Sequence, residues 1–138
     1  MEVGITASAF DLLHAGHVLM LKEAKQQCDY LIVALHVDPS KENVNKNKPV
    51  QTLVERYIQL QACKYVDEII PYETEQDLID ILSTIDVHVR IIGVEYKDKN
   101  FTGLAVCKSR GIRIYYNSRD HRFSSSSLRQ RVIDNESI

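Results

Sequence analysis

The stretch SAFDLLHAGH, residues 8–17, follows a short apolar run and opens a segment whose apolar residues have helical spacing. A turn between a strand and a helix is where ligands bind in an open parallel sheet. His14 and His17 are three residues apart, so both imidazoles fall on one side of the first helical turn, beside N–H groups that lack intrahelical partners. Gly16 lets an anion approach the backbone without meeting a Cβ atom. The stretch therefore predicts a phosphate-binding site.

Two other interpretations of the histidine pair stay open. A zinc site would need a third ligand, and the spacing of the other histidines nominates none. Two ordinary surface histidines would leave the adjoining Phe10-Asp11 pair and Gly16 unexplained. The pattern favours the phosphate site over both.

Short apolar runs alternate along the chain with longer amphipathic segments. Strands are predicted at residues 3–7, 30–36, 68–70, 88–92 and 113–116. Helices are predicted at residues 16–27, 54–65, 76–83, 103–109 and 125–133. This alternation is typical of βαβ units around a parallel sheet. The long polar loop at 41–49 is no domain linker, and we expect one α/β, Rossmann-like domain over residues 1–138, with a five-stranded parallel sheet and helices on both faces.

The composition excludes several classes of protein. Of the 138 residues, 44% are hydrophobic and 26% are charged, which is too apolar for a disordered chain. The apolar runs are far shorter than the ~20 residues that a bilayer span needs, and no secretory leader pattern opens the chain. Three cysteines without a CxxC pair favour reduced thiols over a disulfide framework. We therefore expect a cytoplasmic protein that does not bind membranes.

Charge is unevenly distributed along the chain. The net charge of -2 argues against bulk binding to nucleic acid. Residues 67–86 hold seven acidic residues and no basic one, whereas residues 108–131 hold seven basic residues and a single acidic one. The second segment is predicted to meet anions, although an uneven solvated surface is the alternative.

A run of serines, residues 124–127, follows Arg119 and opens the last predicted helix. Serine is a strong helix N-cap, and several in succession present hydroxyls and backbone N–H groups to one anion. A simple capping run before a solvated helix is the alternative.

Residues 8–17 resemble the phosphate-binding signature of the cytidylyltransferase-like nucleotidyltransferases, which is HxGH preceded by Gly-x-Phe-Asp. The stretches KEAK at 22–25, DYL at 29–31 and YVDEIIP at 65–71 follow in the order seen in the glycerol-3-phosphate cytidylyltransferases of this family. The chain departs from the family at Ser8, where glycine is usual, at Val94 in place of aspartate, and at Asp77 and Leu78, where a lysine for the acceptor is found.

The resemblance implies roles for particular residues. It implies a catalytic set that binds the triphosphate and stabilises the negative charge that develops on it during the reaction. These residues are His14, His17, Lys46, Lys48 and Arg119. It implies that the nucleotide contacts Ala9, Phe10, Asp11, Gly16, Glu95, Ser124, Ser125 and Ser126, with Arg56 and Tyr96 in support. Mg²⁺ is the implied cofactor, bridging phosphates with few protein ligands, and Asp11 either touches this metal or orients the acceptor.

The function that follows is transfer of CMP from CTP to glycerol 3-phosphate with release of pyrophosphate. The alternatives are transfer to another phosphorylated acceptor, such as a sugar phosphate or phosphoethanolamine, and a non-catalytic nucleotide-binding domain. A nucleic-acid binder is the weakest, because few aromatic residues accompany the arginines. The expected partners are a nucleoside triphosphate, a phosphorylated small molecule and, by resemblance, a second copy in a homodimer.

Overall fold

The computed structural model describes residues 1–118 and 123–136 and contains one five-stranded parallel sheet. The strands are β1 (Val3–Ser8), β2 (Tyr30–His36), β3 (Glu68–Tyr72), β4 (Val89–Gly93) and β5 (Arg113–Asn117). Their order in the sheet is β3-β2-β1-β4-β5. The order reverses between β1 and β4, and ligands bind at such a switch point, outside the carboxyl ends of the strands.

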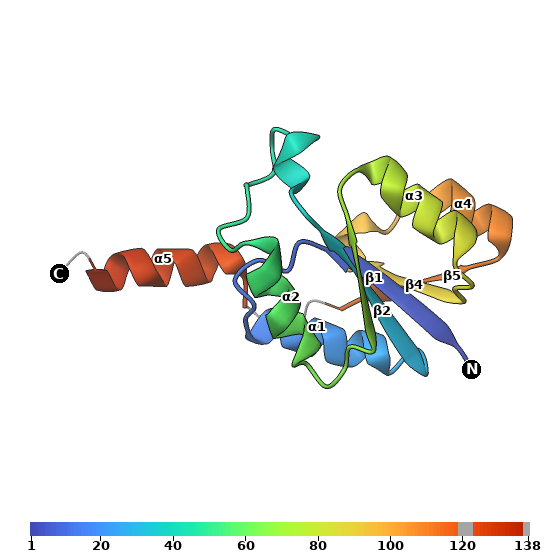
Figure 1. The fold of residues 1–138 in the computed structure, drawn as a ribbon, viewed down its shortest axis with the longest axis horizontal. Coiled ribbons are helices and arrows are strands. Elements are labelled where there is room, and N and C mark those ends of the chain that lie inside the picture. The colour runs from blue at the N-terminus through green and yellow to red at the C-terminus, as the bar shows by residue number, and fades with distance from the viewer. Residues whose placement is uncertain (119–122, 137–138) are drawn as a thin grey trace.

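Helices cover both faces of the sheet (Figure 1). They are α1 (Ala15–Lys25), α2 (Leu53–Gln61), α3 (Glu75–Thr84), α4 (Leu104–Arg110) and α5 (Ser125–Glu136), with short 3-10 turns η1 (Pro39–Lys41) and η2 (Val94–Tyr96). No helix among the described residues is long and apolar enough to cross a membrane. The predicted α/β fold with a five-stranded parallel sheet is confirmed.

Strand β2 divides the hydrophobic core into two layers. Leu31, Val33 and Leu35 are buried in the cluster that contains side chains of α1 and α2. Ile32 and Ala34 are buried in the cluster that contains side chains of α3 and α4. Successive side chains of a strand point to opposite faces, so a strand that is apolar at every position belongs at the centre of a sheet covered on both faces.

The predicted boundaries differ from the observed ones by one to four residues at most ends. β3 continues through Pro71 to Tyr72, which is tolerated because β3 is an edge strand and proline has no N–H to donate. α2 ends at Gln61 rather than at 65, because the chain turns there and packs Tyr65 and Val66 against the core. α5 has no buried residue and extends away from the sheet.

Candidate active site

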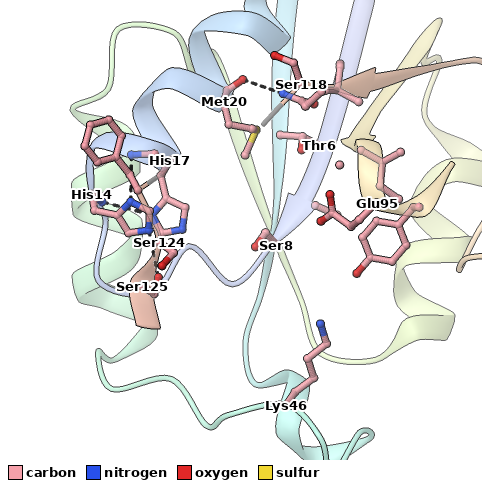
Figure 2. A pocket seen from close by; sticks show the side chains of 18 residues that line it. Thr6, Ser8, His14, His17, Met20, Lys46, Glu95, Ser118, Ser124 and Ser125 are labelled. Carbon is pink, nitrogen blue, oxygen red and sulfur yellow. Dashed lines mark hydrogen bonds between the residues drawn. The ribbon is translucent and has the colours of Figure 1, made fainter. Parts of the chain in front are cut away.

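A cavity of about 310 Å³ opens at the carboxyl edge of the sheet, where α1 and α5 both begin (Figure 2). It is lined by eight of the predicted site residues: His14, Gly16, His17, Lys46, Glu95, Tyr96, Ser124 and Ser125. The histidines and serines lie on one side and Glu95 on the other, while Lys46 points in from the loop after β2. These eight residues come from four separate segments of the chain, which the cavity brings together.

The two histidines form a capping box at the start of α1. His14 Nδ1 accepts the Gly16 N–H at 3.0 Å, and His17 Nδ1 accepts the His14 N–H at 3.3 Å. The rings are stacked, with centroids 3.9 Å apart. Because each Nδ1 accepts a backbone hydrogen, the neutral rings carry their proton on Nε2. The tautomer thus places an N–H on the Nε2 atom of each ring, the kind of donor that can meet a phosphate oxygen.

This arrangement changes the role expected of the first-turn amides. The Gly16 N–H was predicted to be available to phosphate, but it is bonded to His14. Gly16 still lines the cavity and is buried. The imidazole N–H groups therefore stand where the backbone amides of other helix N-termini would meet an anion.

The serine run connects the start of α5 to the start of α1 through hydrogen bonds. His14 Nε2 lies 3.1 Å from Ser125 Oγ, which in turn donates to the Asp11 carbonyl at 3.5 Å. Ser124 Oγ accepts the Ser127 N–H at 3.1 Å and thereby caps α5. Ser126 is exposed and does not line the cavity, so the structure does not bring it together with the other predicted nucleotide residues, and its contact with nucleotide stays a prediction. Its side chain leaves the helix on the solvent side.

The two lysines of the loop after β2 lie in different hollows of the surface. Lys46 lines the cavity, whereas Lys48 lines a shallow hollow with Val50 and Thr52 on the outer side of the loop. The structure therefore does not place Lys48 beside Lys46 at the cavity, and the catalytic role of Lys48 stays a prediction. Arg119, the remaining member of the predicted catalytic set, lies outside the described residues.

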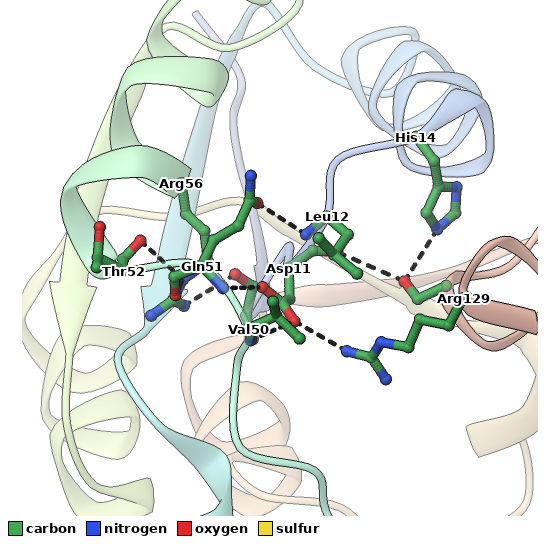
Figure 3. Close-up of polar contacts among 10 residues, drawn as sticks. Asp11, Leu12, His14, Val50, Gln51, Thr52, Arg56 and Arg129 are labelled. Carbon is green, nitrogen blue, oxygen red and sulfur yellow. Dashed lines mark hydrogen bonds and ion pairs between the residues drawn. The ribbon is translucent and has the colours of Figure 1, made fainter. Parts of the chain in front are cut away.

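Asp11 holds this loop rather than facing the cavity (Figure 3). Its carboxylate accepts the Val50 N–H at 2.8 Å, the Gln51 N–H at 2.9 Å and the Arg129 guanidinium at 2.9 Å. Burial raises the pKa of Asp11, but the backbone donors and Arg129 outweigh burial and hold the pKa below its ordinary value. The structure thus shows Asp11 as a positioning residue for the loop, while its contact with metal or acceptor stays a prediction.

The turn around Asp11 is strained. Phe10 and Leu12 have positive φ angles of 48° and 52°, a region that L-residues seldom adopt and that costs about 1–2 kcal/mol per residue. The Leu12 N–H donates to Gln51 Oε1 at 2.9 Å, which holds the turn. Phe10 is buried, and its ring meets the His17 ring edge-on at 5.4 Å. The Phe10 ring thus packs against His17 and orients it, and the contact of Phe10 with nucleotide stays a prediction.

Arg56 acts on the site through backbone carbonyls. Its side chain is 2% exposed and donates to the Ala9, His36 and Val37 carbonyls at 2.7–3.0 Å. Burial lowers the pKa of this guanidinium. Arg56 therefore ties the end of β2 to the turn after β1, while Ala9 has its carbonyl turned toward Arg56 and lies outside the first cavity.

Sequence reasoning missed Asn117, the last residue of β5. Asn117 is 2% exposed and lines the cavity. Its Nδ2 donates to the Met20 carbonyl at 3.2 Å, and its Oδ1 has no hydrogen-bond partner within the described part of the chain. The available signal was a polar residue at the carboxyl end of a strand, the edge at which the other site residues gather.

Mg²⁺ is compatible with this set of donors. Among the residues at 1–118 and 123–136, no group of three His, Cys, Asp or Glu side chains is placed to hold a metal ion. Glu95 is the single carboxylate that the described residues contribute to the cavity wall. Mg²⁺ is commonly bound through one or two carboxylates together with substrate phosphates and water, and Glu95 fits that requirement.

A parallel sheet whose order reverses at β1, with a histidine pair opening the following helix, defines a Rossmann-like fold with a candidate ligand site at the switch point. The chain belongs to the cytidylyltransferase-like family, whose sequence pattern matches residues 5–131. This match confirms the family that the motif at residues 8–17 indicated.

Three relatives illustrate the range of the family. The chain is 36% identical to an ethanolamine-phosphate cytidylyltransferase of Arabidopsis thaliana over 97 residues, which cover 67% of this chain and 22% of that protein. It is 34% identical to the bifunctional protein HldE of Acidiphilium cryptum over 114 residues, 82% of this chain and 23% of that one. The chain thus spans less than a quarter of these curated relatives. A solved structure, the lipopolysaccharide core biosynthesis protein from Thermoplasma volcanium, superposes with a TM-score of 0.69 at 25% identity and covers 87% of this chain and 99% of that one.

Proposed function

We propose that this chain transfers CMP from CTP to a phosphorylated small-molecule acceptor and releases pyrophosphate. The observation that carries the proposal is the stacked pair of His14 and His17, whose rings line a cavity together with Lys46. Glycerol 3-phosphate is the acceptor that the sequence resemblance favours. Ethanolamine phosphate and sugar phosphates are the competing acceptors.

The reaction needs no nucleophile from the protein. An oxygen of the acceptor phosphate attacks the α-phosphorus of CTP, a new P–O bond forms, and the bond from the α-phosphorus to the oxygen that bridges it to the β-phosphorus breaks. Pyrophosphate leaves with the bonding electrons on that oxygen. Because the acceptor is already an anion, catalysis consists of positioning and of stabilising charge on phosphate oxygens.

The residues of the cavity divide this work. We assign His14 and His17 to the triphosphate, with Ser125 Oγ 3.1 Å from His14 Nε2 as part of the same site. Lys46 supplies a positive charge from the opposite loop. Preorganised donors of this kind contribute most where water is excluded. Bound Mg²⁺ would neutralise charge on the phosphates, and Glu95 is the side chain placed to hold it. We keep Arg119 as a proposed phosphate contact on the sequence motif alone.

Asn117 supports CTP as the donor nucleotide. The Nδ2 bond to Met20 fixes the orientation of the amide, so the buried Oδ1 is an acceptor that lacks a donor within the described residues. A buried acceptor is costly unless it is paired. The exocyclic amino group of cytosine is such a donor, whereas uracil has a carbonyl at that position.

The test is an incubation with Mg²⁺, each of the four common nucleoside triphosphates and a panel of acceptors, with the products weighed by mass spectrometry. The proposal predicts a CDP-linked product and an equal amount of pyrophosphate. Tight nucleotide binding without pyrophosphate would favour a non-catalytic binding domain instead.

We also propose a homodimer that acts in the cytoplasm. Apolar side chains are exposed on two helices, with Val54 and Ile58 on α2 at 66% and 59% and Val132 on α5 at 52%. A second copy of this chain would cover them. The three cysteines are free thiols, as in a reducing compartment. Sedimentation analysis at micromolar concentration would test the dimer, and a monomer would contradict it.

A further inference from the structure

A second cavity of about 340 Å³ adjoins the first at the carboxyl edge of the sheet. Ser8, Lys46 and Tyr96 line both cavities, and Figure 2 shows Ser8 between the histidine side and the Glu95 side. Two reactants that meet at one phosphorus must bind side by side. The second cavity is therefore placed to hold the molecule that receives the CMP group.

His36 forms part of the wall of this cavity, and its ring is incompletely bonded. The residue is 5% exposed, and the ring stacks on Tyr72 with centroids 4.4 Å apart. Its Nε2 is buried and has no hydrogen-bond partner in the described part of the chain. Buried polar atoms are nearly always paired, so this nitrogen points to a polar group on a ligand. A hydroxyl fits best, because it pairs with Nε2 whether that atom donates or accepts.

Arg90 adds a fixed positive charge to the same cavity. It is 5% exposed, its Nη1 donates to the Thr102 carbonyl, and its guanidinium lies 5.0 Å from the centre of the Phe101 ring. An arginine stays protonated in proteins. The cavity wall thus contains a buried cation that is held in place on two sides.

The charges of the wall select the ligand. The described charged residues that line the cavity are Lys46, Glu75 and Arg90, which leaves one net positive charge when His36 is neutral. A phosphate is attracted by that charge. An ammonium group on the same ligand would meet the buried guanidinium in a site where charges are poorly screened. An ammonium group has no lone pair to accept a hydrogen from His36 Nε2, whereas a hydroxyl can both donate and accept.

We propose that the second cavity is the acceptor subsite and that His36 and Arg90 make it select a phosphate with an uncharged, hydroxylated body, such as a polyol or sugar phosphate, over an aminoalkyl phosphate. This inference rests on the proposed function. It also discriminates among the relatives, one of which is named for ethanolamine phosphate.

The test compares glycerol 3-phosphate, glucose 1-phosphate and phosphoethanolamine as acceptors, with CTP and Mg²⁺ saturating. The full chain is used as wild type, His36→Phe, Arg90→Met and a control, Arg113→Met. His36→Phe keeps the ring that stacks on Tyr72. Arg113 forms an ion pair with Glu2 at the opposite end of the sheet.

We expect a hydroxylated acceptor to exceed phosphoethanolamine in kcat/KM by at least tenfold. His36→Phe should raise KM for the hydroxylated acceptor about tenfold, the equivalent of one buried hydrogen bond, and leave KM for CTP unchanged. Arg90→Met should reduce the ratio of kcat/KM for the hydroxylated acceptor to kcat/KM for phosphoethanolamine. Arg113→Met should change neither this ratio nor the KM for the hydroxylated acceptor. Preference for phosphoethanolamine, or equal kinetics in His36→Phe and wild type, would overturn the inference and leave the proposed function standing.

A binding measurement separates the two proposals if no acceptor is turned over. The ring signals of His36 are followed by NMR while glycerol 3-phosphate, glucose 1-phosphate or phosphoethanolamine is added without nucleotide, with His88 as the reference signal. If the His36 signals shift with a hydroxylated phosphate and not with phosphoethanolamine, the selectivity of the cavity is supported. This conclusion holds even where the absence of turnover refutes the proposed transfer. Absence of that shift, or an equal shift with phosphoethanolamine, overturns the inference. This readout also applies if Arg90→Met fails to fold.

Discussion

Replacing Asp11 with asparagine should destabilise the fold and loosen the loop that carries Lys46. The carboxylate accepts three hydrogen bonds, from Val50, Gln51 and Arg129. Asparagine retains one accepting oxygen, while its NH₂ group faces donors. Hydrogen bonds to a charged group contribute about 1.5–3 kcal/mol each, and unpaired buried donors add to the loss. Allowing for one retained bond and partial exposure of Arg129, we expect a loss of about 2–4 kcal/mol.

The assay is urea unfolding followed by far-UV circular dichroism at neutral pH. Asp80→Asn serves as the matched control, since Asp80 is exposed and accepts a side-chain bond from Gln76 on its own helix. Arg129→Met separates the ion pair from the two backbone bonds and should cost about 1 kcal/mol, a value typical of a partly exposed pair. Asp11→Asn should also raise KM for CTP, because Lys46 is on the loop that Asp11 holds. Equal stability of Asp11→Asn and Asp80→Asn would refute the positioning role.

The same residue predicts a pH dependence. The pKa of Asp11 is lowered in the folded protein, so its contribution to stability is fully present above the ordinary value of about 3.9. The contribution is lost as the pH falls through the lower, folded value. The stability gap between wild type and Asp11→Asn should therefore be constant near neutral pH and close below about pH 4. A gap that changes between pH 6 and pH 8 would contradict this reasoning.

Three further predictions concern the nucleotide. His14→Ala and His17→Ala should each lower kcat roughly 10²-fold, the range for loss of a charge-stabilising donor, with the fold retained by circular dichroism; a near-normal rate in either would remove the histidines from the mechanism. Asn117→Leu should reduce the preference for CTP over UTP in competition assays, whereas an unchanged preference would place base recognition elsewhere. Arg119→Ala should weaken CTP binding in calorimetric titration and Arg119→Lys should restore it only in part, because a point charge cannot form a two-pronged phosphate contact; losses as large at Arg131→Ala would indicate a diffuse basic surface.

The fold was predictable because its determinants are local. Strand β2 is apolar at every position from Leu31 to Leu35, which marks a strand buried on both faces, and the helical repeats between strands require parallel connections. Strand ends were less predictable. The extension of β3 through Pro71 depends on its place at the edge of the sheet, which the sequence of β3 itself does not reveal.

The site was predictable where its residues share one turn of a helix. It was less predictable where the hydrogen-bond partners are distant in the sequence. His14 and His17 are three residues apart, so their pairing follows from helix geometry. Asp11 bonds to residues 39, 40 and 118 positions away, and no local pattern announces those partners. Lys46 and Lys48 are equivalent in the sequence, yet the path of the loop turns one inward and the other outward. Asn117 and His36 stand out because the fold buries one polar atom of each without a hydrogen-bond partner among the residues that the structure describes.

The central claim is direct transfer of CMP to the acceptor in the cavity of His14 and His17. The most direct test follows CTP labelled with ³²P at the α-phosphorus through one turnover with Mg²⁺ and acceptor, quenched in acid. The account predicts that the label passes to the acceptor product, with none on the protein at any time and with an equal yield of unlabelled pyrophosphate. Label bound to the protein, or label that stays in CTP while the acceptor is present, would contradict it.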